Sequence, residues 1–155
     1  MFIKHLTKEQ ALQKLKHYCG YQERCQSEVK EKLWQLKVSK KKHDEIIAKL
    51  IEEDYLNEER FAVQFAGGKY RIKQWGRVKI KYELKQKQVS EYSIKKALRL
   101  IDEDDYIKTL NKLAEKKYDS LKNEQRMVKK KKTIDFLMQR GFEFALISSL
   151  TQIKE

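Results

Sequence analysis

The chain has 155 residues, of which 40% are hydrophobic and 38% charged, and a formal net charge of +13. It contains no proline and only 5 glycines, a composition that favours helix along most of its length. No run approaches the ~20 apolar residues of a membrane span, and no apolar run follows Met1–His5 as a signal peptide requires. We therefore expect a cytoplasmic protein, and the positive charge suggests a polyanionic partner.

The first predicted unit, residues 1–54, contains three helices with hydroxyl side chains at their starts. Thr7, with a glutamine three positions later, has the form of a capping box, and Gly20 is the expected end of that helix. Ser27 and Ser39 are the expected caps of the next two helices. Apolar residues recur at helical spacing and predict the buried faces: Ala11, Leu12, Leu15, Tyr18, Val29, Leu33, Leu36, Ile46, Ile47, Leu50 and Ile51.

The second predicted unit, residues 55–101, begins at Asn57, where two glutamates follow in the first helical turn. Trp75-Gly76 is expected to end this helix, and Ser90 to cap the last helix of the unit. The predicted apolar positions of these two helices are Phe61, Ala62, Phe65, Ala66, Ile72, Ile94, Leu98 and Ile101.

Between them, residues 77–85 alternate polar and apolar side chains, which is the period of a half-buried strand. No second strand of comparable quality exists to pair with this segment, and a lone strand is not stable. The segment also occupies the place of a predicted helix in the first unit. We therefore predict a helix.

The third predicted unit, residues 102–155, follows an acidic cluster, Asp102–Asp105, that suits a helix start. Gly141 is the expected end of its second main helix. The predicted apolar positions are Ile107, Leu110, Leu113, Ala114, Tyr118, Ile134, Leu137, Met138, Phe144, Ile147 and Leu150.

The three units look like imperfect copies of one another. Each has a leucine five positions before an apolar residue at its second turn: Leu33 and Val38, Leu84 and Val89, Leu137 and Phe142. The turn recurs after 51 and then 53 positions, a period typical of stacked helical modules. The sequence therefore predicts an all-α fold, a tandem repeat of three-helix modules forming an elongated, curved array.

Nothing in the sequence has the pattern of a catalytic or metal site. Cys19 and Cys25 match no familiar zinc spacing and are expected to be reduced, partly buried thiols. Gly67-Gly68 lacks the following Lys-Ser/Thr of a phosphate loop, and the three histidines, His5, His17 and His43, have no obvious nucleophile or carboxylate beside them. We predict no cofactor, no metal and no enzymatic activity; an unrecognised active site is a distant third hypothesis.

Basic residues gather in the middle of the chain and are interleaved with aromatic ones. Lysine and arginine neutralise phosphates, and aromatic rings stack on exposed bases, so this segment is the main candidate for a partner surface. A shorter lysine run lies in the third unit. For both basic segments the alternative is a solvent-exposed helix face that binds no partner. In that case Trp75 lies in the core. The candidate partner-binding or nucleic-acid-binding residues are Lys69, Arg71, Lys73, Trp75, Arg77, Lys79, Lys81, Lys85, Lys129 and Lys130.

Three stretches carry motifs specific enough to suggest a family. Residues 55–62 read Tyr-Leu-Asn-Glu-Glu-Arg-Phe-Ala; Trp75-Gly76-Arg77 precedes Glu83-Leu84 and Lys87-Gln88-Val89-Ser90; and Arg140-Gly141-Phe142 precedes the last helix. These stretches resemble the RecX regulators of the bacterial recombinase RecA and cover about two-thirds of the chain. Two positions depart from the family pattern. Asn57 replaces an aspartate and keeps the cap, and Gln88 replaces a glycine, which tolerates positive φ.

The resemblance implies tandem three-helix modules and a regulator without catalysis. Such a protein binds the RecA–DNA filament and limits filament growth, ATP hydrolysis and strand exchange. Apart from the resemblance, we expect weak contact with DNA through the basic face without sequence preference, no membrane partner, and a monomer. The alternative is a stand-alone DNA-binding protein of helix-turn-helix type, with the Gly76–Lys87 or the Ser90–Leu100 helix in the major groove.

Overall fold

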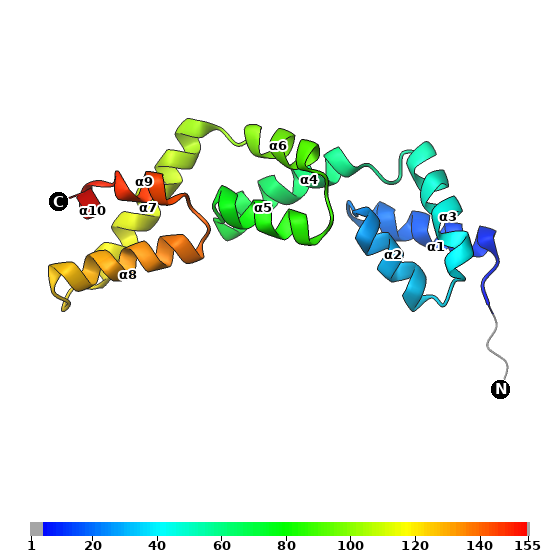
Figure 1. The fold of residues 1–155 in the computed structure, drawn as a ribbon, viewed down its shortest axis with the longest axis horizontal. Coiled ribbons are helices and arrows are strands. Elements are labelled where there is room, and N and C mark those ends of the chain that lie inside the picture. The colour runs from blue at the N-terminus through cyan, green and yellow to red at the C-terminus, as the bar shows by residue number, and fades with distance from the viewer. Residues whose placement is uncertain (1–4, 155) are drawn as a thin grey trace.

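The computed structural model describes residues 5–154, and the regular secondary structure of this part of the chain is all helix, with no strand. The helices form an elongated row, with α1–α3 at one end and α7–α10 at the other (Figure 1). None of these helices has the length and hydropathy to cross a lipid bilayer. Residues 1–4, on which part of the signal-peptide expectation rests, lie outside the described range. In chain order the elements are α1 (Lys8–Tyr21), α2 (Gln26–Gln35), α3 (Lys40–Glu52), α4 (Glu58–Gly68), the π-helical turn η1 (Lys69–Lys73), α5 (Arg77–Gln86), α6 (Glu91–Arg99), α7 (Glu103–Ser120), α8 (Arg126–Gln139), α9 (Phe144–Ser148) and α10 (Thr151–Lys154).

Most of the predicted helix starts are confirmed by their caps. Thr7 forms the full capping box at α1, and the side chains of Asn57 and Asp102 accept backbone N–H groups at 2.9 Å in the first turns of α4 and α7. Two details were wrong. Helix α1 continues through Gly20 to Tyr21. Helix α2 begins after Cys25, whose backbone N–H donates to the Glu28 side chain at 3.0 Å, and the Ser27 hydroxyl donates to the distant carbonyl of Lys87 at 2.9 Å.

The predicted repeat appears as one turn geometry used three times. The residue before each apolar turn position has a positive φ, in order Lys37 (58°), Gln88 (63°) and Gly141 (91°). The next N–H then donates to the carbonyl five positions earlier, as in Val38 to Leu33 (3.0 Å), Val89 to Leu84 (3.1 Å) and Phe142 to Leu137 (3.2 Å). Gln88 adopts the left-handed conformation without the glycine usual in the family, so this turn keeps the shared geometry.

Two apolar cores run along the row. One lies within α1–α3. The other is continuous from α4 through α10, and it also includes Cys25 from the start of α2. The second and third units share one core, so the core does not separate them near residue 101. The unit boundaries predicted near residues 54 and 101 stay predictions. The helix predicted for residues 77–85 is confirmed as α5, and it buries Ile80 and Leu84.

Four side chains expected in the core face solvent, namely Ile51, Ile72, Met138 and Phe144. Ile72 is 79% exposed. It lies in η1, where the wider π-helical turn shifts the following residues away from the face that α4 buries.

The connections between units differ in kind. The first and second units are joined by side chains: Arg60 of α4 pairs with Glu23 and, at 3.1 Å, with Asp54. The second and third units are joined main chain to main chain, because the Gly76 N–H donates to the Arg140 carbonyl at 2.7 Å. A Cβ on Gly76 would lie 2.3 Å from the Gly141 oxygen, so only glycine permits this approach.

Candidate interaction surface

Two of the predicted lysines gather around two aromatic rings at the joint between η1 and α5. Phe65 and Trp75 meet edge to face with ring centroids 6.5 Å apart. The Lys69 ammonium lies 5.1 Å from the Trp75 centroid, and the Lys79 ammonium lies 4.5 Å from it. The Lys87 ammonium lies 5.8 Å from the Phe65 centroid. We call Phe65, Lys69, Trp75, Lys79 and Lys87 the Trp75 cluster.

The Trp75 cluster holds its ammonium groups in defined positions. A cation over an aromatic face is attracted by the ring quadrupole, by ~0.5–1 kcal/mol at exposed sites. Trp75 and Phe65 are half-buried and pack against the core of the second and third units. Of the two alternatives weighed for Trp75, this packing agrees with the core anchor, while Lys69 and Lys79 lie near its ring. A contact with a partner stays a prediction.

Lys87 extends the cluster to the first unit. Its ammonium lies 3.4 Å from the Glu28 carboxylate of α2. A hollow of about 360 Å³ lies between the two units beside Phe65, Lys69 and Lys87. Sequence reasoning left Lys87 and Phe65 out of the candidate set. Lys87 was visible as the last lysine of the basic segment, whereas Phe65 was expected only as a buried scaffold residue.

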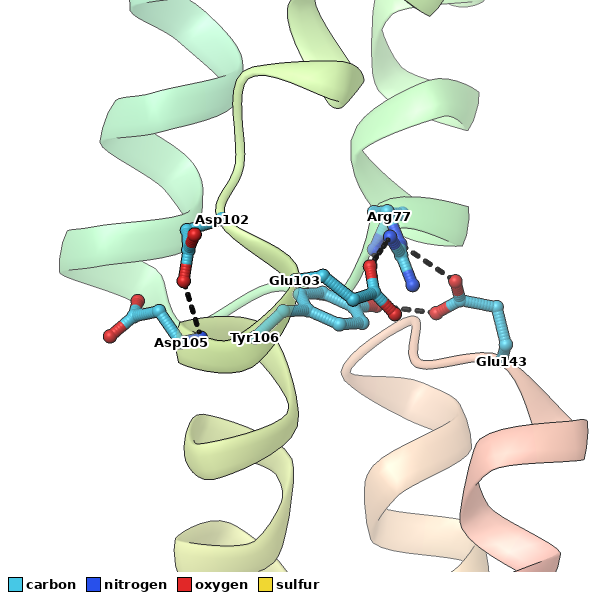
Figure 2. A network of polar contacts seen from close by, with 6 residues as sticks. All are labelled: Arg77, Asp102, Glu103, Asp105, Tyr106 and Glu143. Atoms are coloured by element: carbon cyan, nitrogen blue, oxygen red, sulfur yellow. Dashed lines mark hydrogen bonds and ion pairs between the residues drawn. The ribbon is translucent and has the colours of Figure 1, made fainter.

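The Arg77 side chain forms its contacts within the molecule. Its Nε and Nη1 lie 2.7 Å from Glu143 and 2.7 Å from Glu103, and its guanidinium lies 4.0 Å from the Tyr106 ring centroid (Figure 2). The Tyr106 hydroxyl donates to Glu143 and accepts the Arg77 backbone N–H at 2.9 Å. Burial alone would lower the pKa of Arg77, but the two carboxylates raise it above its ordinary value. We call these four residues the Arg77 network; it ties the start of α5 to the start of α7 and to Glu143, the residue before α9.

A second contact supports the same joint. The Tyr70 hydroxyl donates to Asp105 at 2.6 Å and lies 2.9 Å from the Thr109 hydroxyl. Burial and the neighbouring Asp105, which accepts the phenol proton in a hydrogen bond, raise the pKa of Tyr70 to about 12. Arg77, Tyr70 and Tyr106 together fix the orientation of the third unit relative to the Trp75 cluster.

The remaining predicted residues lie around the Trp75 cluster or far from it. Arg71 and Lys73 are exposed on η1, and Lys85 is exposed near the end of α5. Lys81 lies 3.8 Å from Glu91. Lys129 and Lys130 belong to the start of α8, at the outer end of the row (Figure 1). The fold therefore brings the middle set together and separates it from the α8 lysines.

Sequence models of a known family match both of the units that share a core. The model of the second three-helix domain of RecX matches residues 57–98, and that of its third three-helix domain matches residues 103–150. The chain belongs to the RecX family. The all-α fold of tandem three-helix units is the RecX fold.

Individual RecX proteins give the same result. The regulatory protein RecX of Clostridium tetani is 41% identical over 103 residues, covering 63% of this chain and 48% of its own. That of Pelodictyon phaeoclathratiforme is 31% identical over 134 residues, covering 86% and 82%. The crystal structure of RecX from Lactobacillus salivarius superimposes with a TM-score of 0.83 at 26% identity, covering 95% of this chain and 94% of that one.

Several of these relatives are longer than this chain. The chain spans about half the length of several RecX proteins that it matches, including the 48% of the Clostridium tetani protein. These relatives carry the name of a regulatory protein and not of an enzyme family.

Proposed function

We propose that this chain is an inhibitor of the recombinase RecA that binds the RecA–DNA filament and limits its growth, ATP hydrolysis and strand exchange. The observation that carries the proposal is membership of the RecX family over both units that share a core. The chain acts without catalysis or cofactor, as a cytoplasmic monomer.

The elongated row supports this mode of binding. A filament presents the same surface at regular intervals, and an extended row of helices can touch more than one protomer at once. Each further contact is then made at high effective concentration, so weak contacts combine into tight binding. The network around Arg77 and Tyr106 favours this arrangement, because it holds the second and third units in one orientation and lowers the entropy lost on binding.

The proposed contact surface is the Trp75 cluster with the basic side chains around it. Lys69 and Lys79 lie against Trp75, and Arg71, Lys73, Lys81 and Lys85 extend the positive charge along η1 and α5. Arg77 takes part indirectly, by fixing α5. Lys129 and Lys130 supply a second, separate contact at the outer end of the row.

The test is RecA ATPase activity on single-stranded DNA, with this chain at a small sub-stoichiometric ratio. Strong inhibition is expected, and Lys79→Glu should weaken it because it reverses charge at the Trp75 cluster. Lys112→Glu is the matched control, since it makes the same charge change at an exposed position of α7. Circular dichroism should show equal helicity for all three proteins.

Two results would count against the proposal. Absence of inhibition at equimolar protein and low salt would exclude RecA as the partner. Sequence-selective binding to duplex DNA without recombinase, with a steep dependence on salt, would favour the helix-turn-helix alternative.

A further inference from the structure

The first unit has a hollow of its own, away from the Trp75 cluster. It encloses about 610 Å³ between the second half of α1, the loop after it and α2. Aromatic and basic side chains line it, including Lys14, His17, Tyr18, Tyr21, Arg24 and Lys32. Neither family model covers this unit, since the matches begin at residue 57.

Flat side chains are stacked in this hollow. The Arg24 guanidinium lies 3.8 Å from the Tyr18 ring centroid, and its Nε donates to the Tyr18 carbonyl at 3.1 Å, which fixes its plane. Lys32 approaches the same ring at 5.4 Å. Tyr21 lies 6.0 Å from the Arg24 guanidinium and is 81% exposed. The fold therefore leaves an aromatic face open to solvent beside an oriented guanidinium.

Within the described residues, the cations that line the hollow form no ion pair, whereas two other lysines at α1 do. Lys16 of α1 lies 2.9 Å from Glu53, and Lys8 pairs with Glu45. Within residues 5–154, Lys14, Arg24 and Lys32 form no ion pair. These three cations line the hollow together with the Tyr18 and Tyr21 rings, so it presents positive charge and aromatic side chains together.

We propose that this hollow is a binding site for single-stranded nucleic acid. An unstacked base lies against Tyr21 and the Arg24 plane, and the flanking phosphates lie near Lys14 and Lys32. Stacking tolerates any base because every base has a π face, and the lysines release counterions from the backbone. A duplex keeps its base faces covered and cannot use the exposed ring. An acidic peptide would use the cations but would gain nothing from Tyr21.

The site would add a nucleic-acid contact to the proposed function, but it is tested without recombinase. The full chain is titrated into a fluorescein-labelled oligothymidylate about 16 nucleotides long, and binding is followed by fluorescence anisotropy. We expect the single strand to bind more tightly than a duplex of equal length. Loss of one base stack predicts that Tyr21→Ala weakens binding by about 5- to 150-fold, whereas Tyr21→Phe keeps it.

The controls separate this site from general charge effects. Tyr92→Ala removes another exposed tyrosine, 67% accessible and 5.8 Å from the Lys96 ammonium, and should leave binding unchanged. Arg24→Ala should weaken binding as Tyr21→Ala does. A 4-thiothymidine in the oligonucleotide should cross-link to Tyr21 on irradiation.

Equal binding by Tyr21→Ala and the parent chain would overturn the proposal, as would absence of binding to the single strand. Neither result would bear on inhibition of RecA, which the ATPase measurement decides separately.

Discussion

The Tyr106 hydroxyl offers the sharpest test of how the second and third units are held together. It is fully buried, donates to the Glu143 carboxylate and accepts the Arg77 backbone N–H at 2.9 Å. Tyr106→Phe removes both hydrogen bonds and leaves the ring in place. Glu143 keeps its contact with the Arg77 Nε at 2.7 Å, whereas the Arg77 N–H loses its acceptor.

The expected cost follows from these partners. A hydrogen bond to a charged group contributes ~1.5–3 kcal/mol, and a buried group left without a partner costs ~1–3 kcal/mol. Since Glu143 remains paired, we expect a loss of about 2 kcal/mol in the free energy of unfolding. The control, Tyr82→Phe, alters a ring on α5 that is 59% exposed. It should change this free energy by less than about 0.5 kcal/mol.

The assay is urea denaturation followed by tryptophan fluorescence. The chain has 2 tryptophans, so a Trp34→Phe background leaves Trp75, beside α5, as the reporter of the second unit. If Tyr106→Phe unfolds at the same urea concentration as Tyr82→Phe, the network of Arg77, Glu103, Tyr106 and Glu143 does not stabilise this joint.

Three further predictions concern single positions. Gly141→Ala should unfold the joint between the second and third units, because φ is 91° and a Cβ would lie 2.6 Å from a backbone nitrogen of α5; thermal denaturation measures the loss. Gln88→Gly should raise the free energy of unfolding by roughly 1 kcal/mol in urea, because φ is 63° there, and an unchanged midpoint would contradict this. Burial alone would raise the pKa of Glu58, but hydrogen bonds from Ser90 and Ser93 lower it below its ordinary 4.5. The carboxylate therefore stabilises the fold above about pH 4.5 and loses this effect as pH falls through the lowered pKa. Glu58→Gln should destabilise at pH 7, and its difference from the parent should shrink as the pH is lowered below 4.5.

The sequence predicted the local features well because each depends on residues a few positions apart. Thr7, Asn57 and Asp102 cap helices through bonds to backbone three positions on. The spacing of Leu84 and Val89 marks a turn closed by their own backbone atoms. The period within residues 77–85 pointed to a strand, and comparison with the other units corrected it, because a repeated fold imposes the same element on equivalent segments.

The candidate surface was predicted only in outline. The basic segment was visible as composition, but the grouping of Lys69, Lys79 and Lys87 around two rings depends on how η1 and α5 meet. Arg77 has the same sequence context as its basic neighbours. Only the positions of Glu103 and Glu143, 26 and 66 residues later, make it a link between units.

By itself, the sequence determined the helices, their three-fold repeat and the family, since these follow from short-range spacing and local motifs. Tertiary structure alone decided which charges are matched and which remain open. Arg60 and Arg77 meet carboxylates brought from other units, whereas Arg24 and Lys32 meet aromatic rings in a hollow. The physical reason is that ion pairing depends on separations of a few ångströms, and the packing of distant segments sets those separations.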